Sequence, residues 1–317
     1  MNISVILPIY NEEKNLEELF RRLHFSLDKP NLKYEIVAVN DGSHDNSWGV
    51  IRDSALKNHH IKAINFSRNF GQTAAIDAGI RNSSHEIIIP IDADLENDPA
   101  DIHKLLEKIN EGFDVVSGYR INRWQGSWFS RKLPSVIANK LISWVSGVPL
   151  SDYGCTLKAY RKKMVENLRL YGDMHRFIPA YAGWNFNARI TEVPVSYTPR
   201  KFGQSNYGLG RVWKVLLDLF VLKFFADYSR RPIHLFGSIG FISILGGIFA
   251  GVLSVYFKLS VANHKDFIQT PLPVIMAMLV MVGVMLIMMG LLAEILVRTY
   301  FENQNQESYK IKEKINF

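Results

Sequence analysis

The 317-residue chain has only one cysteine, and long stretches of it lack charge of one or both signs. Cys155 cannot form an intrachain disulfide, so nothing argues for an oxidising compartment, and a zinc site built on cysteines is excluded. Two runs, 232–257 and 270–293, contain no formally charged residue. Each run exceeds the length of about 20 residues with which an apolar helix crosses a bilayer, which excludes a purely soluble enzyme. Two spans enclose no pore, which also excludes a many-span transporter.

Basic residues flank the two membrane spans, which we place at about 232–257 and 271–297 within a transmembrane domain of residues 232–317. Two adjacent arginines precede the first span and Arg298 closes the second, whereas the loop between the spans carries little net positive charge. Basic flanks of membrane spans face the cytoplasm. We therefore expect an integral protein of the cytoplasmic (inner) membrane, with its N-terminal domain, its C-terminal tail and both termini in the cytoplasm.

Two further segments combine basic, aromatic and apolar residues. No acidic residue occurs in 115–151, and we expect an interfacial segment at about 119–147, where Lys and Arg are interleaved with tryptophan and phenylalanine. Residues 206–231 fit an amphipathic juxtamembrane helix directly before the first span. Such helices suit the membrane interface, although a core-packing helix with one solvated face gives the same pattern.

Small residues in the first span permit close contact between helices. Gly247 and Gly251 are four residues apart. The spacing fits a contact between the two spans of one chain and equally a contact between subunits of a homo-oligomer.

Residues 1–205 have the pattern of an α/β domain. Short β-branched runs alternate with helical patterns along its first part. The expected strands are Ile3–Ile9, Glu35–Asn40, Ile61–Phe66, Glu86–Ile91 and Asp114–Ser117, and the expected helices are Glu12–Leu27, Ser47–Lys57, Thr73–Asn82 and Ala100–Gly112. This alternation predicts a Rossmann-like parallel sheet with helices on both faces. Ligands of such sheets bind beyond the carboxyl ends of the strands.

The strongest candidate site is the strand end at which an isoleucine-rich run leads into Asp92 and Asp94. Two carboxylates this close repel each other unless a cation lies between them. Mg²⁺ prefers oxygen ligands and is commonly held by one or two carboxylates together with substrate phosphates. The pattern therefore predicts a Mg²⁺ or Mn²⁺ site that binds a diphosphate. The alternative is that these aspartates only shape a turn or cap a helix.

Two other strand ends carry residues that suit a nucleoside. Asp41 follows the second strand and can accept hydrogen bonds from a base or a ribose. Tyr10 lies where the first strand meets the first helix and can stack on a nucleobase. Glu12 lies at the same junction, where the positive end of the helix dipole equally favours a purely structural acid. We expect these strand ends to meet in one crevice.

Six short motifs, in this order and spacing, resemble a known family. They are Pro8–Glu12, Asn40–Ser43, Arg68–Gln72, Asp92–Leu95, Gly118–Arg120 and Asp152–Cys155. The chain resembles glycosyltransferases of family 2 with the GT-A fold over essentially its whole length. Within that family it is most similar to polyprenyl-phosphate glycosyltransferases of the dolichyl-phosphate-mannose-synthase type. The bacterial branch with two C-terminal spans, which glucosylates undecaprenyl phosphate, is the best match.

The resemblance implies a donor site and a metal site. The residues implied for the nucleotide-sugar are Pro8, Tyr10, Glu12, Asp41 and Gly71. The residues implied for Mg²⁺ or Mn²⁺ are Asp92, Asp94 and Glu96. The family usually has glutamine at the position of Glu96, so this chain departs from the pattern there. Glu96 either binds the metal more strongly or turns away as a helix acid.

The resemblance also implies an acceptor site and a reaction. Arg120, Arg131 and Ser135 match positions that bind the acceptor phosphate, and Asp152 joins Asp92 and Asp94 among the residues implied in catalysis. A lipid phosphate is already an anionic nucleophile, so no general base is required. The implied reaction is inverting transfer of glucose from UDP-glucose to undecaprenyl phosphate at the cytoplasmic membrane face. GDP-mannose and a UDP-linked modified arabinose are alternative donors.

Other classes of protein fit the sequence less well. A processive polysaccharide synthase carries a Gln-x-x-Arg-Trp run, which is absent here. A dinucleotide-binding oxidoreductase needs a glycine-rich turn after a strand, and the nearest run, 208–213, has Trp213 in the third glycine place. Nucleic-acid binding could follow from the net charge of +7, but the basic residues cluster beside the spans. A non-catalytic membrane scaffold or flippase subunit would not need Asp92 and Asp94.

Overall fold

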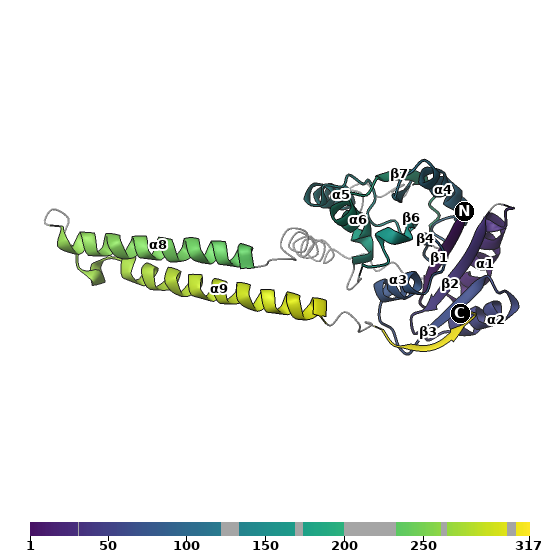
Figure 1. The fold of residues 1–317 in the computed structure, drawn as a ribbon, viewed down its shortest axis with the longest axis horizontal. Helices are drawn as coiled ribbons and strands as arrows, with labels where there is room; N and C mark the ends of the chain where they lie inside the picture. Colours follow the sequence, from purple (N-terminus) through teal and green to yellow (C-terminus); the bar gives the residue numbers. More distant parts are fainter. Residues whose placement is uncertain (31, 122–132, 169–173, 200–232, 261–264, 303–308) are drawn as a thin grey trace. The chain divides into compact units, whose positions relative to one another are not determined.

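The computed structural model describes residues 1–317 except 31, 122–132, 169–173, 200–232, 261–264 and 303–308 (Figure 1). The chain divides into two compact units, one made of residues 1–220 and 307–317 and the other of residues 221–306. We call them the sheet unit and the hairpin unit. The amphipathic helix expected at 206–231 lies outside the described residues.

One mixed sheet of eight strands forms the centre of the sheet unit, in the order β7-β5-β6-β4-β1-β2-β3-β8. The strands are β1 (Asn2–Ile9), β2 (Lys33–Asn40), β3 (Ile61–Phe66), β4 (Ile87–Pro90), β5 (Val115–Arg120), β6 (Lys158–Arg161), β7 (Ile190–Val195) and β8 (Ile311–Ile315). β1 is parallel to β2 on one side and to β4 on the other. The carboxyl ends of these three strands therefore lie at the same edge of the sheet.

Helices cover both faces of the sheet (Figure 1). The described helices of the sheet unit are α1 (Glu13–Leu27), α2 (Ser47–Lys57), α3 (Gln72–Arg81), α4 (Ile102–Asn110), α5 (Leu133–Ser146) and α6 (Ile178–Phe186), with short 3₁₀ turns at Pro99–Asp101, Lys162–Met164 and Met174–Phe177. Successive side chains of a strand point to opposite faces. In β1, Val5 and Leu7 belong to the cluster that packs on α1 and α4, whereas Ile6 packs with Ile76 of α3.

The α/β class predicted from the sequence is confirmed, and the expected strands and helices of the first 120 residues are present. The five expected strands run parallel to one another, as predicted. Two strands that were not expected run in the opposite direction to their neighbours. β6 pairs antiparallel with β4 and β5, and β8 pairs antiparallel with β3. β8 was not expected, because its charged residues are typical of a solvated tail.

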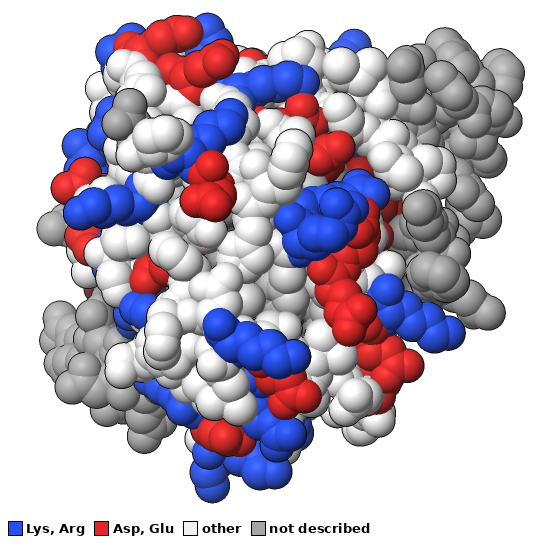
Figure 2. Space-filling model, turned by 90° about the vertical axis from the view of Figure 1, so that its right-hand side faces the viewer, with Lys and Arg blue, Asp and Glu red and all other residues white. Residues whose placement is uncertain are grey.

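Charges of both signs are interspersed on the face of the sheet unit that Figure 2 shows. Exposed ion pairs within a single helix include Arg21 and Arg22 with Glu18 on α1. Exposed pairs of this kind contribute little to stability, because solvent screens the charges.

Two long apolar helices make up the hairpin unit. An 18-residue window of α8 (Ile233–Leu259) has a mean hydropathy of 2.1, and one within the apolar part of α9 (Leu272–Glu302), residues Leu272–Leu296, has a mean hydropathy of 2.8. At about 1.5 Å per residue, either helix is longer than the roughly 30 Å hydrocarbon core of a bilayer. They coincide with the two segments that the sequence predicts to cross the membrane, and their length and composition suit that role. A 3₁₀ turn, Phe267–Gln269, precedes α9.

Glycines allow the backbones of α8 and α9 to approach each other closely. A Cβ atom on Gly240 would lie 2.7 Å from the carbonyl oxygen of Gly283, and one on Gly247 would lie 2.8 Å from Val280. Gly251 lies against Met276 in the same way. Gly247 and Gly251 therefore pack between the two helices of one chain, which is one of the two contacts that their spacing predicted.

We expect Gly240→Ala to destabilise the hairpin unit by about 1–3 kcal/mol, the usual effect of overpacking, because the new methyl meets backbone that cannot move aside. The midpoint of thermal unfolding of the full chain in detergent measures this effect. Gly237→Ala is the matched control, since its Cβ would meet only Ile233 at 3.7 Å. Alanine there should leave the midpoint unchanged or raise it, because alanine is the better helix former. Equal midpoints for both variants would contradict the close packing of the two helices.

Candidate active site

A pocket of about 240 Å³ opens at the carboxyl ends of β1, β2 and β4. It is lined by Pro8, Ile9, Tyr10, Glu12, Asp41, Asn69, Gly71, Gln72, Asp92, Ala93 and Asp94. All five residues predicted for the nucleotide-sugar are in this lining, together with both aspartates of the predicted metal site. The single crevice expected from the strand ends is therefore present.

The loop between β3 and α3 holds Asp41. The backbone N–H groups of Phe70 and Gly71 donate to the two carboxylate oxygens of Asp41 at 2.7 and 2.9 Å. The side-chain amide of Asn69 donates to the Asp41 carbonyl at 3.2 Å. Burial raises the pKa of the Asp41 carboxyl, and the two backbone hydrogen bonds oppose that rise. Asp41 is thus fixed in orientation at the wall of the pocket.

Close approach of two loops explains the glycine that follows Asp41. Gly42 has a φ of 64°, in the left-handed region, and a Cβ atom there would lie 2.3 Å from the carbonyl carbon of Arg68. A side chain at this position would separate the two loops. The glycine of the Asn-Asp-Gly-Ser motif is therefore required locally by the backbone, independently of any ligand.

Tyr10 and Glu12 lie at the mouth of the pocket, where β1 passes into α1. The Tyr10 ring is 42% exposed and meets His44 edge-on, at 6.2 Å between ring centres. Glu12 is the residue before the first turn of α1, and its carboxylate accepts a hydrogen bond from the Asn15 amide at 2.6 Å. The structural role considered for Glu12 is therefore present, and its side chain also lines the pocket.

Asp92 is held by two side chains from other elements. The Gln72 amide donates to its Oδ1 and the Thr156 hydroxyl donates to its Oδ2, both at 2.7 Å. Burial, and then the neighbouring charge of Asp94, raise the pKa of the Asp92 carboxyl to about 6. Neither partner was predicted, because both contacts join residues far apart in the sequence and depend on the folded chain.

Asp94 is buried, with 5% of its surface exposed, and the turn that follows it is strained. Its Oδ1 accepts the backbone N–H of Glu96 at 3.0 Å. Leu95, between them, has a φ of 62°, which branched and bulky side chains rarely adopt and which costs on the order of 1–3 kcal/mol. The fold retains this turn at the point where the Asp92 and Asp94 carboxylates enter the pocket.

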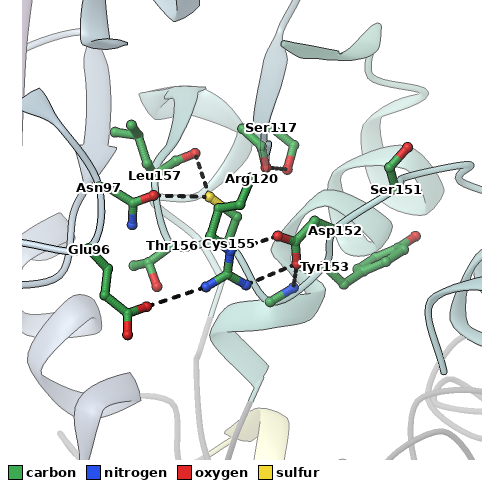
Figure 3. A network of polar contacts seen from close by, with 12 residues as sticks. Glu96, Asn97, Ser117, Arg120, Ser151, Asp152, Tyr153, Cys155, Thr156 and Leu157 are labelled. Atoms are coloured by element: carbon green, nitrogen blue, oxygen red, sulfur yellow. Dashed lines mark hydrogen bonds and ion pairs between the residues drawn. The ribbon is translucent and has the colours of Figure 1, made fainter. Parts of the chain in front are cut away.

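Arg120, at the end of β5, lies between two carboxylates (Figure 3). Its Nε and Nη2 donate to Asp152 at 2.7 and 3.0 Å, in the bidentate geometry that guanidinium and carboxylate favour. Its Nη1 lies 3.7 Å from Glu96, and the side chain is 6% exposed. Glu96 thus turns toward Arg120 and does not line the pocket.

The buried amine of Lys158 holds the loop that carries Asp152 and Thr156. Its Nζ donates to the carbonyl of Tyr153 at 3.2 Å and to the carbonyl of Cys155. Burial lowers the pKa of this amine. The role of Lys158 was not predicted, since a single lysine in a short strand carries no signal of its own.

The acceptor residues predicted from the sequence are only partly described. Arg131 lies outside the described residues, and Ser135 is half-buried in the first turn of α5. Neither Arg120 nor Ser135 lines the pocket at the strand ends. Their binding of an acceptor phosphate stays a prediction.

The acidic side chains of the pocket could supply only some of the ligands of a metal cation, so a bound substrate and water would supply the others. Within the described residues no three His, Cys, Asp or Glu side chains gather as a metal site. Asp92 and Asp94 remain, and burial, together with the neighbouring charge of Asp94, raises the pKa of Asp92. Two carboxylates suit a hard divalent cation whose remaining ligands come from a diphosphate and water.

Comparisons with known proteins agree with this architecture. A family model described as glycosyl transferase family 2 matches residues 4–169. Dodecaprenyl-phosphate galacturonate synthase from Rhizobium johnstonii is 36% identical over 323 residues, covering 99% of this chain and 93% of that protein.

Solved structures with the same fold come from a mycobacterial enzyme. Glucosyl-3-phosphoglycerate synthase from Mycobacterium tuberculosis in complex with Mn²⁺ and uridine-diphosphate-glucose has a TM-score of 0.53 and 16% identity, covering 72% of this chain and 81% of that one. Its complex with Mn²⁺, uridine-diphosphate and phosphoglyceric acid has a TM-score of 0.54 and 16% identity, covering 72% and 80%. At this identity the likeness shows the fold alone. With the family match and the near-full-length relative, it follows that the chain belongs to glycosyltransferase family 2 and is a glycosyltransferase with a GT-A-like domain.

Proposed function

We propose that the chain transfers a hexose unit from a UDP-sugar to polyprenyl phosphate at the cytoplasmic face of the membrane. The observation that carries this proposal is the 36% identity to a dodecaprenyl-phosphate galacturonate synthase over 99% of the chain, which includes both apolar helices. An acceptor with a long polyprenyl tail stays in the bilayer. An enzyme with its own membrane spans therefore meets the acceptor phosphate at the headgroup level.

On the donor side, the pocket offers groups for each part of a nucleotide-sugar. Tyr10 presents an exposed ring to a base, and Asp41 presents an oriented carboxylate to the base or ribose. Asp92 and Asp94 would hold a divalent cation, Mg²⁺ or Mn²⁺, which would neutralise the leaving diphosphate. Gln72 and Thr156 orient Asp92 for that role.

On the acceptor side, the phosphate is already a nucleophile, so the protein has to place it and offset its charge. Arg120, together with Arg131 and Ser135, would bind it. An acceptor that reaches Arg120 competes with Asp152 and Glu96 for the guanidinium N–H groups. Binding of the acceptor phosphate to Arg120 would therefore weaken the hydrogen bonds between Arg120 and Asp152. Direct displacement inverts the anomeric centre.

Two sugars are supported by different observations. Glucose from UDP-glucose follows from the motif resemblance, and galacturonic acid is favoured by the name of the relative. The two sugars differ in the charge at C6, so a galacturonate site needs a cation near that carboxylate. GDP-mannose and a UDP-linked modified arabinose remain alternative donors.

A transfer assay tests the proposal and identifies the sugar. The purified full chain in detergent receives polyprenyl phosphate, Mg²⁺ or Mn²⁺, and one labelled donor at a time: UDP-glucose, UDP-galacturonic acid, GDP-mannose or a UDP-linked modified arabinose. We expect label to enter the lipid fraction from one UDP-sugar and EDTA to abolish the transfer. Absence of lipid-linked label with every donor would refute the proposed reaction.

Asp94→Asn should lower transfer by about 10²-fold or more, because the cation contributes several kcal/mol to stabilising the leaving diphosphate. The initial rate of label transfer at saturating donor measures this change. Asp53→Asn is the control, since Asp53 is an exposed acid on α2 whose side chain is 60% accessible. Wild-type rates for Asp94→Asn would remove Asp94 from the metal site.

The affinity for the cation should fall as the pH is lowered through about 6, because the raised pKa of Asp92 means that the cation competes there with a proton. Above that pH the carboxyl is ionised and the affinity should level off. Titration of Mn²⁺ binding at pH 5, 6 and 7.5 in the presence of UDP measures this. An affinity that is constant over this range would show that Asp92 is not a ligand.

A further inference from the structure

The segment that follows the second apolar helix returns to the sheet. Strand β8 pairs antiparallel with β3, from Ala63 opposite Ile315 to Phe66 opposite Ile311. Figure 1 shows this strand, in yellow, along the edge of β3. Its far end is fixed by Asn316, whose side-chain amide donates to the carbonyls of Ala55 and Ile61 at 2.6 and 2.8 Å.

The near end of this segment contacts the loop that follows β3. The backbone N–H of Ser67 donates to the carbonyl of Lys310 at 3.0 Å. The ring of Tyr309 stacks on Phe66, with 5.0 Å between ring centres and 17° between planes, and Tyr309 is buried. Phe66 in turn meets Phe70 edge-on at 5.6 Å. Tyr309 therefore packs on Phe66, and Phe66 packs on Phe70.

The same loop forms a wall of the donor pocket. The backbone of Phe70 and Gly71 donates to both carboxylate oxygens of Asp41, and Asn69 and Gly71 line the pocket. Residues 67–69 are exposed, so the loop has little core of its own. Its position is set from two sides, by Asp41 at the pocket and by the segment 309–315 at the sheet edge.

We propose that strand β8 and Tyr309 are positioning elements of the donor site. They hold loop 67–71 in the conformation in which Phe70 and Gly71 orient Asp41. A loop that is ordered before the ligand arrives saves the ligand the free energy of ordering it. The inference rests on the proposed function in one respect, which is that this pocket binds the nucleotide. It adds that donor affinity depends on residues at the opposite end of the chain.

UDP binding in the presence of Mn²⁺ tests the inference, with the full chain in detergent. We expect Tyr309→Ala to weaken UDP binding about three- to tenfold, the usual range for the loss of one aromatic pair. Tyr309→Phe should restore the wild-type affinity, because it keeps the ring that stacks on Phe66. Glu313→Ala, an exposed position on the same strand, is the matched control and should bind like the wild type.

Two further readouts separate positioning from a loss of stability. In the transfer assay, Tyr309→Ala should raise the KM for the donor and leave kcat nearly unchanged. Hydrogen exchange of the Phe70 and Gly71 amides should be faster in nucleotide-free Tyr309→Ala, while the amides of β1 exchange as in the wild type. If Tyr309→Ala does not fold, Tyr309→Leu, which keeps apolar volume without stacking, is measured by the same criteria.

The outcomes distinguish this inference from the function on which it rests. Equal UDP affinity for the wild type and the folded Tyr309 variant would overturn the inference and leave the proposed function intact. A wild-type chain that binds no UDP would overturn the proposed UDP-sugar donor and the inference with it.

Discussion

Repulsion between like charges is the constraint around which this site is arranged. Parallel strands bring Asp41, Asp92 and Asp94 to one edge of the sheet, where their carboxylates line one pocket. Two backbone N–H groups offset the charge of Asp41, and burial together with the charge of Asp94 raises the pKa of Asp92 to about 6. Outside the pocket, Arg120 lies between Asp152 and Glu96. On the proposed reaction, the donor arrives with the cation that this cluster of carboxylates needs.

The sequence was enough to predict the central strands and the residues at their ends, because buried strands are continuous apolar runs and polar residues mark where they stop. It was not enough for β8, whose five residues Ile311–Ile315 include three charged ones. Charged side chains are common on edge strands, where they discourage pairing with other chains. A strand of this kind resembles a solvated tail until the sheet that receives it is known.

The side chains that contact the predicted site residues could not be predicted from the sequence, for a different reason. Gln72 and Thr156 bond Asp92 across separations of 20 and 64 residues, and nothing in a linear motif specifies such pairs. Arg120 was predicted to bind an anion, and the structure pairs it with carboxylates of the protein itself. The sequence shows that Arg120 carries a positive charge. The fold is needed to show that, without substrate, this charge is paired with Asp152 and Glu96.

Strand β8 is also the last part of the sheet to be synthesised. β3 ends at Phe66, whereas the strand that covers its edge begins at Ile311, after both apolar helices. At about 5–20 residues per second, a ribosome needs on the order of tens of seconds for the chain between them. Throughout that time β3 presents an open edge, which can pair with the wrong chain. A nascent chain that stalls before the end of the hairpin would therefore keep the edge of β3 unpaired. Chaperones and proteases that bind exposed strand edges could then distinguish it from the completed protein.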